Sequence, residues 1–517
     1  MAKVIYKYYN PNDNLLLPPC LGDYLPQNHP SRVVSAIIDR LDMSEIESGY
    51  KGGGTSSYNP RMLLKVIVYA YLNNVYSGRQ MEKLLVENIA YMWLSGMQTP
   101  DFRTINIFRS KRLADKFEKI FTQIVCLLNE EGLVSLKVQY IDGTKIESVA
   151  NKYTFVWKGS TEKNKAKLEE KVKTVLKNAE EVLAMESTES GEELTSEEME
   201  KRAERILSKM DEEGISDKKL RKVVEKVKSE SAPKMQEYEE KLETLGERNS
   251  YSKTDPEATF MRMKEDAMNN GQTKPGYNVQ IATENQFITN YGIFQRPTDQ
   301  GTFIPFITSF SDRYGIQSEE ICADSGYGSE QNYAHMSRIG VKPYVKYNMF
   351  HAEDKRSRKK NPFLVQNLYF NAEEDYYVFP MGQHLVHVGD FISTSYLGYK
   401  SLVSKYKAQN CEGCPLRGMC HKGKSDRVIE VNHQNNAYRS EAKALLTSER
   451  GLHHRSMRPI EPEAVFGDIK FNHGFKRFRL KSKVKVSVEF GLVATAHNLR
   501  KYIALMKNQG SQCLCGA

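Results

Sequence analysis

Apolar residues recur at helical spacing through the first part of the chain. Valines, isoleucines and leucines three and four positions apart predict a helix over residues 31–41. A strongly apolar run starts at Pro60, a residue favoured in the first turn of a helix, and predicts a helix over 60–72. Ser77 is a typical N-cap residue. Further helices are therefore expected from Ser77, over about 82–95, and over 99–112.

The last of these expected helices is basic. It carries Arg103 and Arg109, together with Lys111 and Arg112. Short helices with tight turns and a basic final helix are typical of a helix-turn-helix-like DNA-binding domain. An ordinary helical bundle with solvated arginines explains the same pattern equally well.

Two short apolar runs each contain or precede an aspartate that lies within two residues of a glycine. The run 138–147 contains Asp142 followed by Gly143, which predicts either an acid at the exposed end of a buried strand or an ordinary hairpin turn. The run 319–323 leads into Asp324 and a Gly-rich turn. A pair of strands that end on acids is a candidate site for chemistry.

The remaining pattern alternates between strands and helices. Asn285-Gln286 separates two alternating segments and predicts a hairpin turn. The order of elements predicts an α/β core with long insertions. Strands are expected over 277–284, 287–294 and 341–347, and helices over 301–313, 329–338 and 486–506.

Charge is distributed unevenly along the chain. Residues 160–250 are rich in Glu and Lys, with apolar residues at three-four spacing, which predicts a charged helical hairpin or short coiled coil. This segment holds 24 acidic and 19 basic residues, a net charge of −5. Because the whole chain has a formal net charge of +9, the rest of the chain carries about +14. A body that basic indicates a polyanionic partner, although charge that serves only solubility explains the number as well.

Cysteines gather in the segment 350–435, which otherwise reads as irregular and basic. Cys411, Cys414 and Cys420, followed by His421, have the residue types and the close spacing of a structural zinc site. A cluster of reduced thiols is the alternative. Neither an N-terminal signal peptide nor an apolar run of about 18 residues is found, so we expect a cytoplasmic protein with no membrane span.

The C-terminal part supplies a third acid. Glu463 and Lys470 are seven positions apart, which places both on one face of a helix. The stretch 470–485 then interleaves basic residues, Arg477 and Arg479 among them, with phenylalanines, a mixture suited to contact with a nucleic-acid backbone.

Three carboxylates in such settings suit two-metal phosphoryl transfer. Asp142, Asp324 and Glu463 could hold two Mg²⁺ or Mn²⁺ ions, because these cations prefer oxygen ligands. Glu461 competes with Glu463 for the third position.

The chain resembles the DDE-type transposases of bacterial insertion sequences, of the insertion-sequence family 1182-like group, which have an RNase H-like mixed-sheet core and a helical N-terminal domain. The resemblance implies that Asp142, Asp324 and Glu463 are the catalytic triad and that Lys470 contacts DNA. It also implies double-stranded DNA partners, namely the terminal inverted repeats and target DNA, and a homodimer that brings two ends together. The motifs that carry it are Tyr140-Ile-Asp-Gly-Thr-Lys-Ile-Glu147, Ala323-Asp-Ser-Gly-Tyr-Gly328, the Cys-x-x-Cys-Pro element, Glu463-Ala-Val-Phe-Gly-Asp-Ile-Lys470, Phe475-Lys-Arg-Phe478 and Ala496-His-Asn-Leu-Arg500.

One motif departs from the family pattern. The family places a Tyr and an Arg at fixed intervals before the catalytic Glu, but here those positions are Ser456 and Pro459. We expect Arg458 or Arg455 to substitute for the missing arginine, and we expect both to contact DNA.

The sequence thus predicts a DNA transposase that cleaves element ends and transfers their 3′-hydroxyl groups. A metal-dependent nuclease without strand transfer and a DNA-binding protein that has lost catalysis are the alternatives. The expected regions are a helical DNA-binding domain (1–130), the first part of the core (131–159), a helical insertion (160–250), the second part of the core (251–349), an insertion with the cysteines (350–435) and the C-terminal part of the core (436–517).

Overall fold

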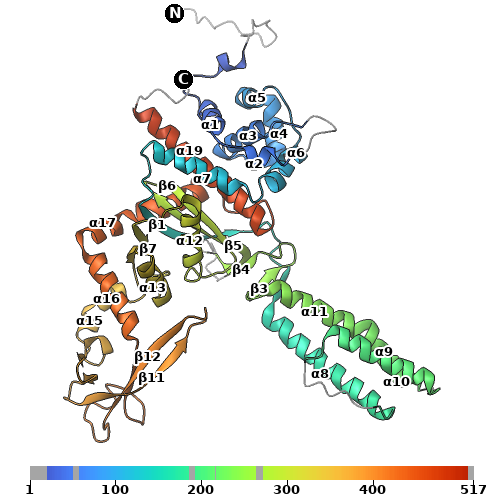
Figure 1. Ribbon diagram of the computed structural model, residues 1–517, viewed down its shortest axis with the longest axis vertical. Coiled ribbons are helices and arrows are strands. Elements are labelled where there is room, and N and C mark those ends of the chain that lie inside the picture. Colours follow the sequence, from blue (N-terminus) through green and yellow to red (C-terminus); the bar gives the residue numbers. More distant parts are fainter. Residues whose placement is uncertain (1–19, 51–56, 186–192, 216, 264–271, 510–517) are drawn as a thin grey trace, which may run out of the picture.

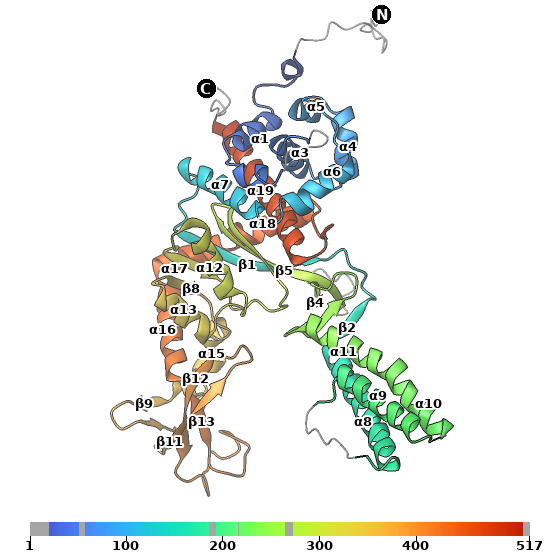
Figure 2. The same ribbon diagram turned by 45° about the vertical axis from the view of Figure 1, so that its right-hand side comes forward.

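The computed structural model describes residues 20–50, 57–185, 193–215, 217–263 and 272–509. Figures 1 and 2 show a central sheet, a group of N-terminal helices at one end of the molecule, and two arms that extend from the opposite end. The protein is therefore of the α/β class, as the sequence predicts. Among the described residues, no helix has the length and apolar character needed to span a bilayer.

The central sheet is mixed, with strand order β6–β5–β1–β7–β8. β1 is antiparallel to β5 and parallel to β7, and β4 extends the sheet beside the first residues of β5. β1 therefore lies in the middle, with neighbours on both sides. The strands are β1 (Val138–Glu147), β4 (Thr259–Arg262), β5 (Thr273–Glu284), β6 (Phe287–Phe294), β7 (Glu320–Ala323) and β8 (Lys342–Val345).

The predicted hairpin between β5 and β6 is confirmed, but the setting of Asp142 differs from the prediction. Asn285 and Gln286 both have positive φ, as a tight two-residue hairpin requires. Asp142 lies within β1 and pairs with Ile281, so the prediction of a strand end or a hairpin turn there is wrong. Gly143 makes no turn; a Cβ at this position would lie 2.7 Å from the Asp299 carboxylate.

The N-terminal helices pack on the long C-terminal helix α19, which in turn covers β6. Their apolar side chains and those of β5 and β6 form one continuous hydrophobic core. The two helices expected between residues 77 and 95 are present, and they meet at Asn88, whose side chain caps α5. The helices are η1 (Leu21–Tyr24), α1 (Pro30–Asp39), α2 (Ser44–Glu47), α3 (Pro60–Leu72), α4 (Gly78–Glu87), α5 (Ile89–Ser95), α6 (Phe102–Ile107), the π-helical η2 (Phe108–Arg112), α7 (Phe117–Glu130) and α19 (Lys483–Gln509).

The helical arm, residues 158–245, is a bundle with its own apolar core. The expected hairpin or coiled coil is therefore wrong in detail, because shorter helices fold back against α8 and share its buried face. The two-stranded ribbon of β2 and β3 joins the helical arm to the central sheet. Its elements are β2 (Phe155–Trp157), α8 (Lys158–Val182), α9 (Ser196–Glu212), α10 (Lys218–Lys226), η3 (Val227–Ser231), α11 (Ala232–Leu245) and β3 (Ser250–Ser252).

The β arm, residues 369–431, is a five-stranded antiparallel sheet in the order β13–β12–β11–β10–β9. The prediction of an irregular segment over 350–435 is wrong, because most side chains of the long strand β11 are at least partly exposed and leave no alternating apolar signal. The strands are β9 (Tyr369–Asn371), β10 (Tyr376–Val378), β11 (His384–Thr394), β12 (Lys400–Ala408) and β13 (Val428–Val431).

The remaining helices surround β7 and β8 and lead to α19. Those before the β arm are α12 (Phe303–Tyr314), α13 (Glu330–Arg338), α14 (Phe350–Glu353), α15 (Arg356–Lys359) and η4 (Val365–Asn367). Those after it are α16 (His433–Thr447), α17 (Glu449–Met457), the π-helical η5 (Pro459–Glu463), α18 (Ala464–Gly467) and the π-helical η6 (Asp468–Asn472).

Candidate active site

The three predicted catalytic acids surround a single guanidinium group. Arg458 Nη2 lies 3.3 Å from Asp142 Oδ1 and 3.5 Å from Asp324 Oδ2, and its Nη1 lies 2.5 Å from Glu463 Oε1. We call these four residues the acid site. Segments far apart in the sequence thus deliver three negative charges to one point.

Sheet topology explains why the two aspartates meet. β1 and β7 are parallel neighbours, and Tyr140 pairs with Cys322. Two residues further along each strand, Asp142 and Asp324 therefore lie level at the same edge. Asp142 is buried within β1, whereas Asp324 follows the end of β7 and accepts a hydrogen bond from the Gly326 N–H.

A π-helical turn aligns Arg458 with Glu463. The two residues are five positions apart, and the turn η5 spans Pro459–Glu463. Because a π-turn adds one residue to the helical repeat, it brings positions i and i+5 to the same side. Pro462 in this turn has no N–H to donate to a regular helical ladder. Because of this extra residue, Arg458 reaches Glu463 although it lies one position before Pro459, where the family pattern places its arginine. Arg455 packs over Phe350 instead.

The charges at the acid site are strongly coupled. Burial alone would lower the pKa of Arg458, but Asp142, Asp324 and Glu463 outweigh it and raise that pKa. Lys346, at the end of β8, has a lowered pKa because of its burial and the nearby Arg458. The three carboxylates of the acid site therefore share one positive partner, Arg458.

A fourth carboxylate, which sequence reasoning missed, lies beside this site. Asp299 Oδ1 accepts hydrogen bonds from Asn278 Nδ2 at 2.7 Å and Gln280 Nε2 at 2.9 Å. Tyr327 donates to Gln280, and burial together with Asp299, Asp142 and Asp324 raises the pKa of its hydroxyl. The signal was present in β5, where Asn278 and Gln280 are polar residues two apart in the buried part of the strand.

Glu461 faces a different part of the molecule from Glu463. Its carboxylate accepts a hydrogen bond from the Gln286 N–H at 2.7 Å, at the β5–β6 turn. Burial raises the pKa of Glu461. Glu463, in contrast, is half-exposed and bound to Arg458. The structure therefore groups Glu463, and not Glu461, with Asp142 and Asp324, while the catalytic role of Glu463 stays a prediction.

A buried histidine fixes the helix that carries Arg458. His454 lies one turn earlier on α17, and its ring contacts the Tyr140 hydroxyl at 2.9 Å and Glu320 Oε2 at 2.9 Å. A neutral ring satisfies both partners when Nε2–H donates to Glu320 and Nδ1 accepts from Tyr140. Burial lowers the pKa of His454. This network ties α17 to β1 and β7, the strands that deliver the aspartates.

Three of the basic residues predicted to contact DNA are buried, namely Lys470, Arg109 and, within the acid site, Arg458. Lys470 Nζ donates to Thr144 Oγ1 at 2.6 Å and to the main-chain oxygen of Lys145 at 3.1 Å, so it braces β1 near Asp142. Arg109 is 3% exposed and donates to the Tyr71 hydroxyl at 2.9 Å. Both side chains hold the protein together in this structure.

The other basic candidates are closer to solvent. Arg477 is exposed and donates to main-chain oxygens of Ser148, Val149 and Ala150, which fastens the chain after β1. Arg103 and Arg479 are exposed. Their contact with DNA stays a prediction. The phenylalanines of this stretch differ from the expectation, since Phe471 is exposed but Phe475 and Phe478 pack in the core.

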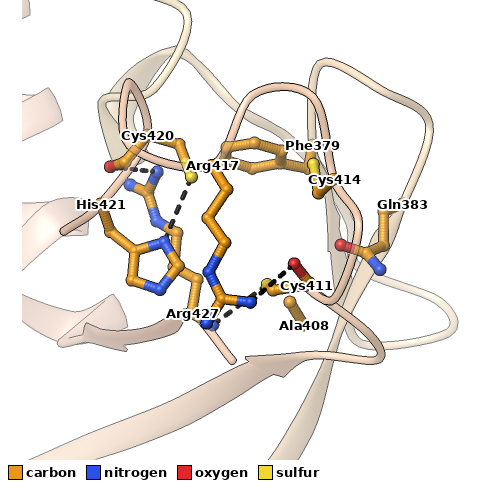
Figure 3. A pocket seen from close by; sticks show the side chains of 9 residues that line it. All are labelled: Phe379, Gln383, Ala408, Cys411, Cys414, Arg417, Cys420, His421 and Arg427. Carbon is orange, nitrogen blue, oxygen red and sulfur yellow. Dashed lines mark hydrogen bonds between the residues drawn. The ribbon is translucent and has the colours of Figure 1, made fainter. Parts of the chain in front are cut away.

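The cysteine cluster, Cys411, Cys414, Cys420 and His421, lines one small pocket at the end of the β arm opposite the β11–β12 turn (Figure 3). The Cys420 thiol lies 3.2 Å from His421 Nδ1, and Cys411 Sγ accepts a hydrogen bond from the main-chain N–H of Arg427. Figure 3 shows the Arg417 side chain between Cys420 and the other two cysteines.

No set of three His, Cys, Asp or Glu side chains in the described part of the chain is arranged to hold a metal ion. In the cysteine cluster, the Arg417 side chain between Cys420 and the other two thiols favours the thiol cluster over the zinc site. For the acid site, the donor chemistry fits a divalent cation, because three carboxylates already surround a positive group. Arg458 lies where those carboxylates converge and stands in for such a cation.

Comparison with known proteins assigns two segments of the chain. Residues 19–111 match the family model described as "Transposase domain (DUF772)", and residues 379–503 match that described as "Transposase DDE domain". The second match includes Glu463 and Arg458, while Asp142 and Asp324 lie outside both. No curated protein and no solved structure matches the chain. Both matched segments are transposase domains, and together they support a DDE-type insertion-sequence transposase.

Proposed function

We propose that the chain binds the ends of its insertion sequence, cleaves them, and joins the 3′-hydroxyl ends to target DNA. The observation that carries this proposal is the convergence of Asp142, Asp324 and Glu463 on Arg458. A group of carboxylates at one point suits in-line displacement at a phosphodiester. The motifs of the sequence support a place in the 1182-like group.

The strand arrangement supports an RNase H-like core. The order β6–β5–β1–β7–β8 has three antiparallel strands followed by two strands parallel to β1, as in an RNase H-like sheet. In that core the acids lie on the central strand, on its parallel neighbour and on a late helix. The helical arm and the β arm are then insertions between core elements.

The acids would hold one or two Mg²⁺ or Mn²⁺ ions, which when bound would activate the attacking water or hydroxyl and stabilise the leaving oxygen. The chain's own contribution is positioning. Lys470 and Arg477 brace the strand that carries Asp142, and Arg458 holds the carboxylates together. The partner is double-stranded DNA in the cytoplasm, and two copies of the chain would bring two ends together.

Strand transfer by the purified protein tests the proposal. A labelled fragment with the element ends is incubated with Mg²⁺ and wild type, Glu463→Gln or Glu461→Gln. We expect joined products from wild type and Glu461→Gln, because Glu461 faces the β5–β6 turn, and none from Glu463→Gln.

Two results would contradict the proposal. Cleavage without joining would indicate a nuclease. DNA binding without cleavage in all three proteins would indicate that catalysis has been lost.

A further inference from the structure

A groove of about 1630 Å³ lies between the helical arm, the central sheet and the tip of the β arm. The base of the helical arm contributes Trp157 and residues 244–250, and the turn between β11 and β12 contributes residues 396–398. Pockets for small molecules have volumes of about 300–1,000 Å³. The groove is therefore large enough for a polymer, and we call it the inter-arm groove.

The charged side chains that line the inter-arm groove are mostly basic. They are Lys158, Arg248, Arg296 and Lys483, with Glu247 as the acidic member. Glu247 is bound to Arg296. Lys158 donates to the Gly246 main-chain oxygen and Arg248 to that of Pro256, so neither of these bonds removes a positive charge. Although the helical arm as a whole is acidic, its base offers a positive lining that complements a polyanion.

Aromatic rings stand exposed at the inter-arm groove. Trp157 is 37% exposed, and its ring lies 5.9 Å from that of buried Phe260, between centroids. Next to it Phe155 is 48% exposed. On the opposite side, the 70% exposed Tyr396 contacts Thr298 through its hydroxyl. Large rings left in water on both sides of a basic groove are flat apolar surfaces on which another flat group can stack.

The inter-arm groove and the acid site share one loop. Gln300 and Gly301 line the groove, and the adjacent Asp299 lies beside the acid site through its bonds to Asn278 and Gln280. A polymer bound in the groove would therefore approach the acids along this loop.

We propose that the inter-arm groove binds an unpaired segment of DNA next to the acid site. In a duplex the bases already stack on each other, so exposed aromatic rings gain stacking partners only from unpaired bases. Basic side chains supply the contacts to the phosphates. This inference rests on the proposed function, since it names the form of DNA held beside the acids.

Fluorescence of Trp157 tests the groove directly. The chain has two tryptophans, so Trp93→Phe leaves Trp157 as the only tryptophan emitter. We expect a short oligothymidylate to quench this emission, and a duplex of equal length to quench it less. Trp157→Ala and Tyr396→Ala, both in the otherwise unchanged protein, should each weaken oligothymidylate binding, measured by anisotropy, by roughly fivefold or more.

Matched variants separate stacking, charge and general damage. Tyr369→Ala removes a ring that is 68% exposed on β9, away from the groove lining, and should leave binding unchanged. Lys158→Gln and Lys483→Gln should each lower the slope of log affinity against log salt by about 0.7.

Three results would overturn the inference: unchanged Trp157 emission, binding that neither Trp157→Ala nor Tyr396→Ala weakens, or equal competition by an acidic peptide, which would indicate a protein partner. Asp324→Ala separates a failure of this inference from a failure of the proposed function. This variant should lose cleavage but bind oligothymidylate as wild type does. A wild-type protein that cleaves DNA but does not bind oligothymidylate would overturn the inference about the groove and leave the proposed function standing.

Discussion

The acid site and the cysteine cluster both consist of residue types that bind metals, yet they are built differently. Arg458 and Asp142 lie 316 positions apart in the chain, and the sheet brings them together. The cysteines lie within one loop, but their sulfur atoms contact separate partners, such as the Arg427 N–H and His421. Residues that are close in sequence therefore need not point to one centre. At the acid site, two parallel strands and a π-turn bring the side chains together.

The largest expected difference between the two groups is in catalysis. Asp324→Ala should reduce cleavage of labelled element ends by at least about 100-fold, because it removes a carboxylate from the acid site. Cys414→Ser should leave the cleavage rate unchanged, since this thiol lines a pocket at the end of the β arm opposite the β11–β12 turn. An equal loss of cleavage rate in the two variants would contradict the different roles given to the acid site and the cysteine cluster.

Removing the central cation should destabilise the acid site. Arg458→Met leaves three carboxylates without their shared partner, which should lower the free energy of unfolding by about 3 kcal/mol in urea titrations without divalent ions. Mn²⁺ should restore part of this loss, because a divalent cation can balance the same carboxylates.

The matched control for this variant is Arg40→Met. Arg40 pairs with Glu130 at the surface, so its loss should cost about 0–1 kcal/mol with no response to Mn²⁺. An Arg458→Met protein as stable as wild type, or one indifferent to Mn²⁺, would contradict the role given to the guanidinium.

The histidine behind the acid site predicts a pH dependence. The folded-state pKa of His454 is lowered by burial, so the unfolded chain binds this proton more readily. Its contribution to stability is therefore present above the ordinary pKa of about 6.5 and is lost as pH falls below that value. Between pH 7 and 5, the free energy of unfolding should fall more steeply for wild type than for His454→Gln. Parallel curves would show that the ring is not held neutral.

The smallest effect is expected at the cysteine cluster. Dialysis against a chelator should leave the Tm unchanged, and Cys414→Ser should change the free energy of unfolding by about 0.5 kcal/mol or less. One zinc ion per chain in a metal analysis, with a Tm that falls on its removal, would restore the zinc site that the cysteine spacing suggested.

The sequence predicts which three acids converge but not the geometry that joins them. Asp324 lies at a strand end as expected, because a short apolar run before Gly-rich residues is a local signal. Gly143 was taken as a turn residue, yet it is glycine because Gln280 and Asp299 approach β1 closely. That approach depends on β5 and on the loop after β6, which no local pattern reveals.

Other differences have similar physical causes. The π-turn between Arg458 and Glu463 displaces the helical repeat by one residue, so spacing rules for an α-helix point to Pro459 instead. The β arm was missed because β11 and β12 bury few side chains and so lack the alternation that marks a half-buried strand. Lys470 was expected at the surface because charge alone does not reveal its bonds to β1.

Cation binding at the acid site is the most direct test of the central claim. Electron paramagnetic resonance would follow free Mn²⁺ as it is titrated into wild type and into a double variant, Asp142→Asn with Asp324→Asn, both bound to DNA that carries an element end. We predict saturable Mn²⁺ binding to wild type that the double variant loses, with DNA affinity unchanged. Equal Mn²⁺ binding by the two proteins would contradict the assignment of these carboxylates as the site of DNA cleavage.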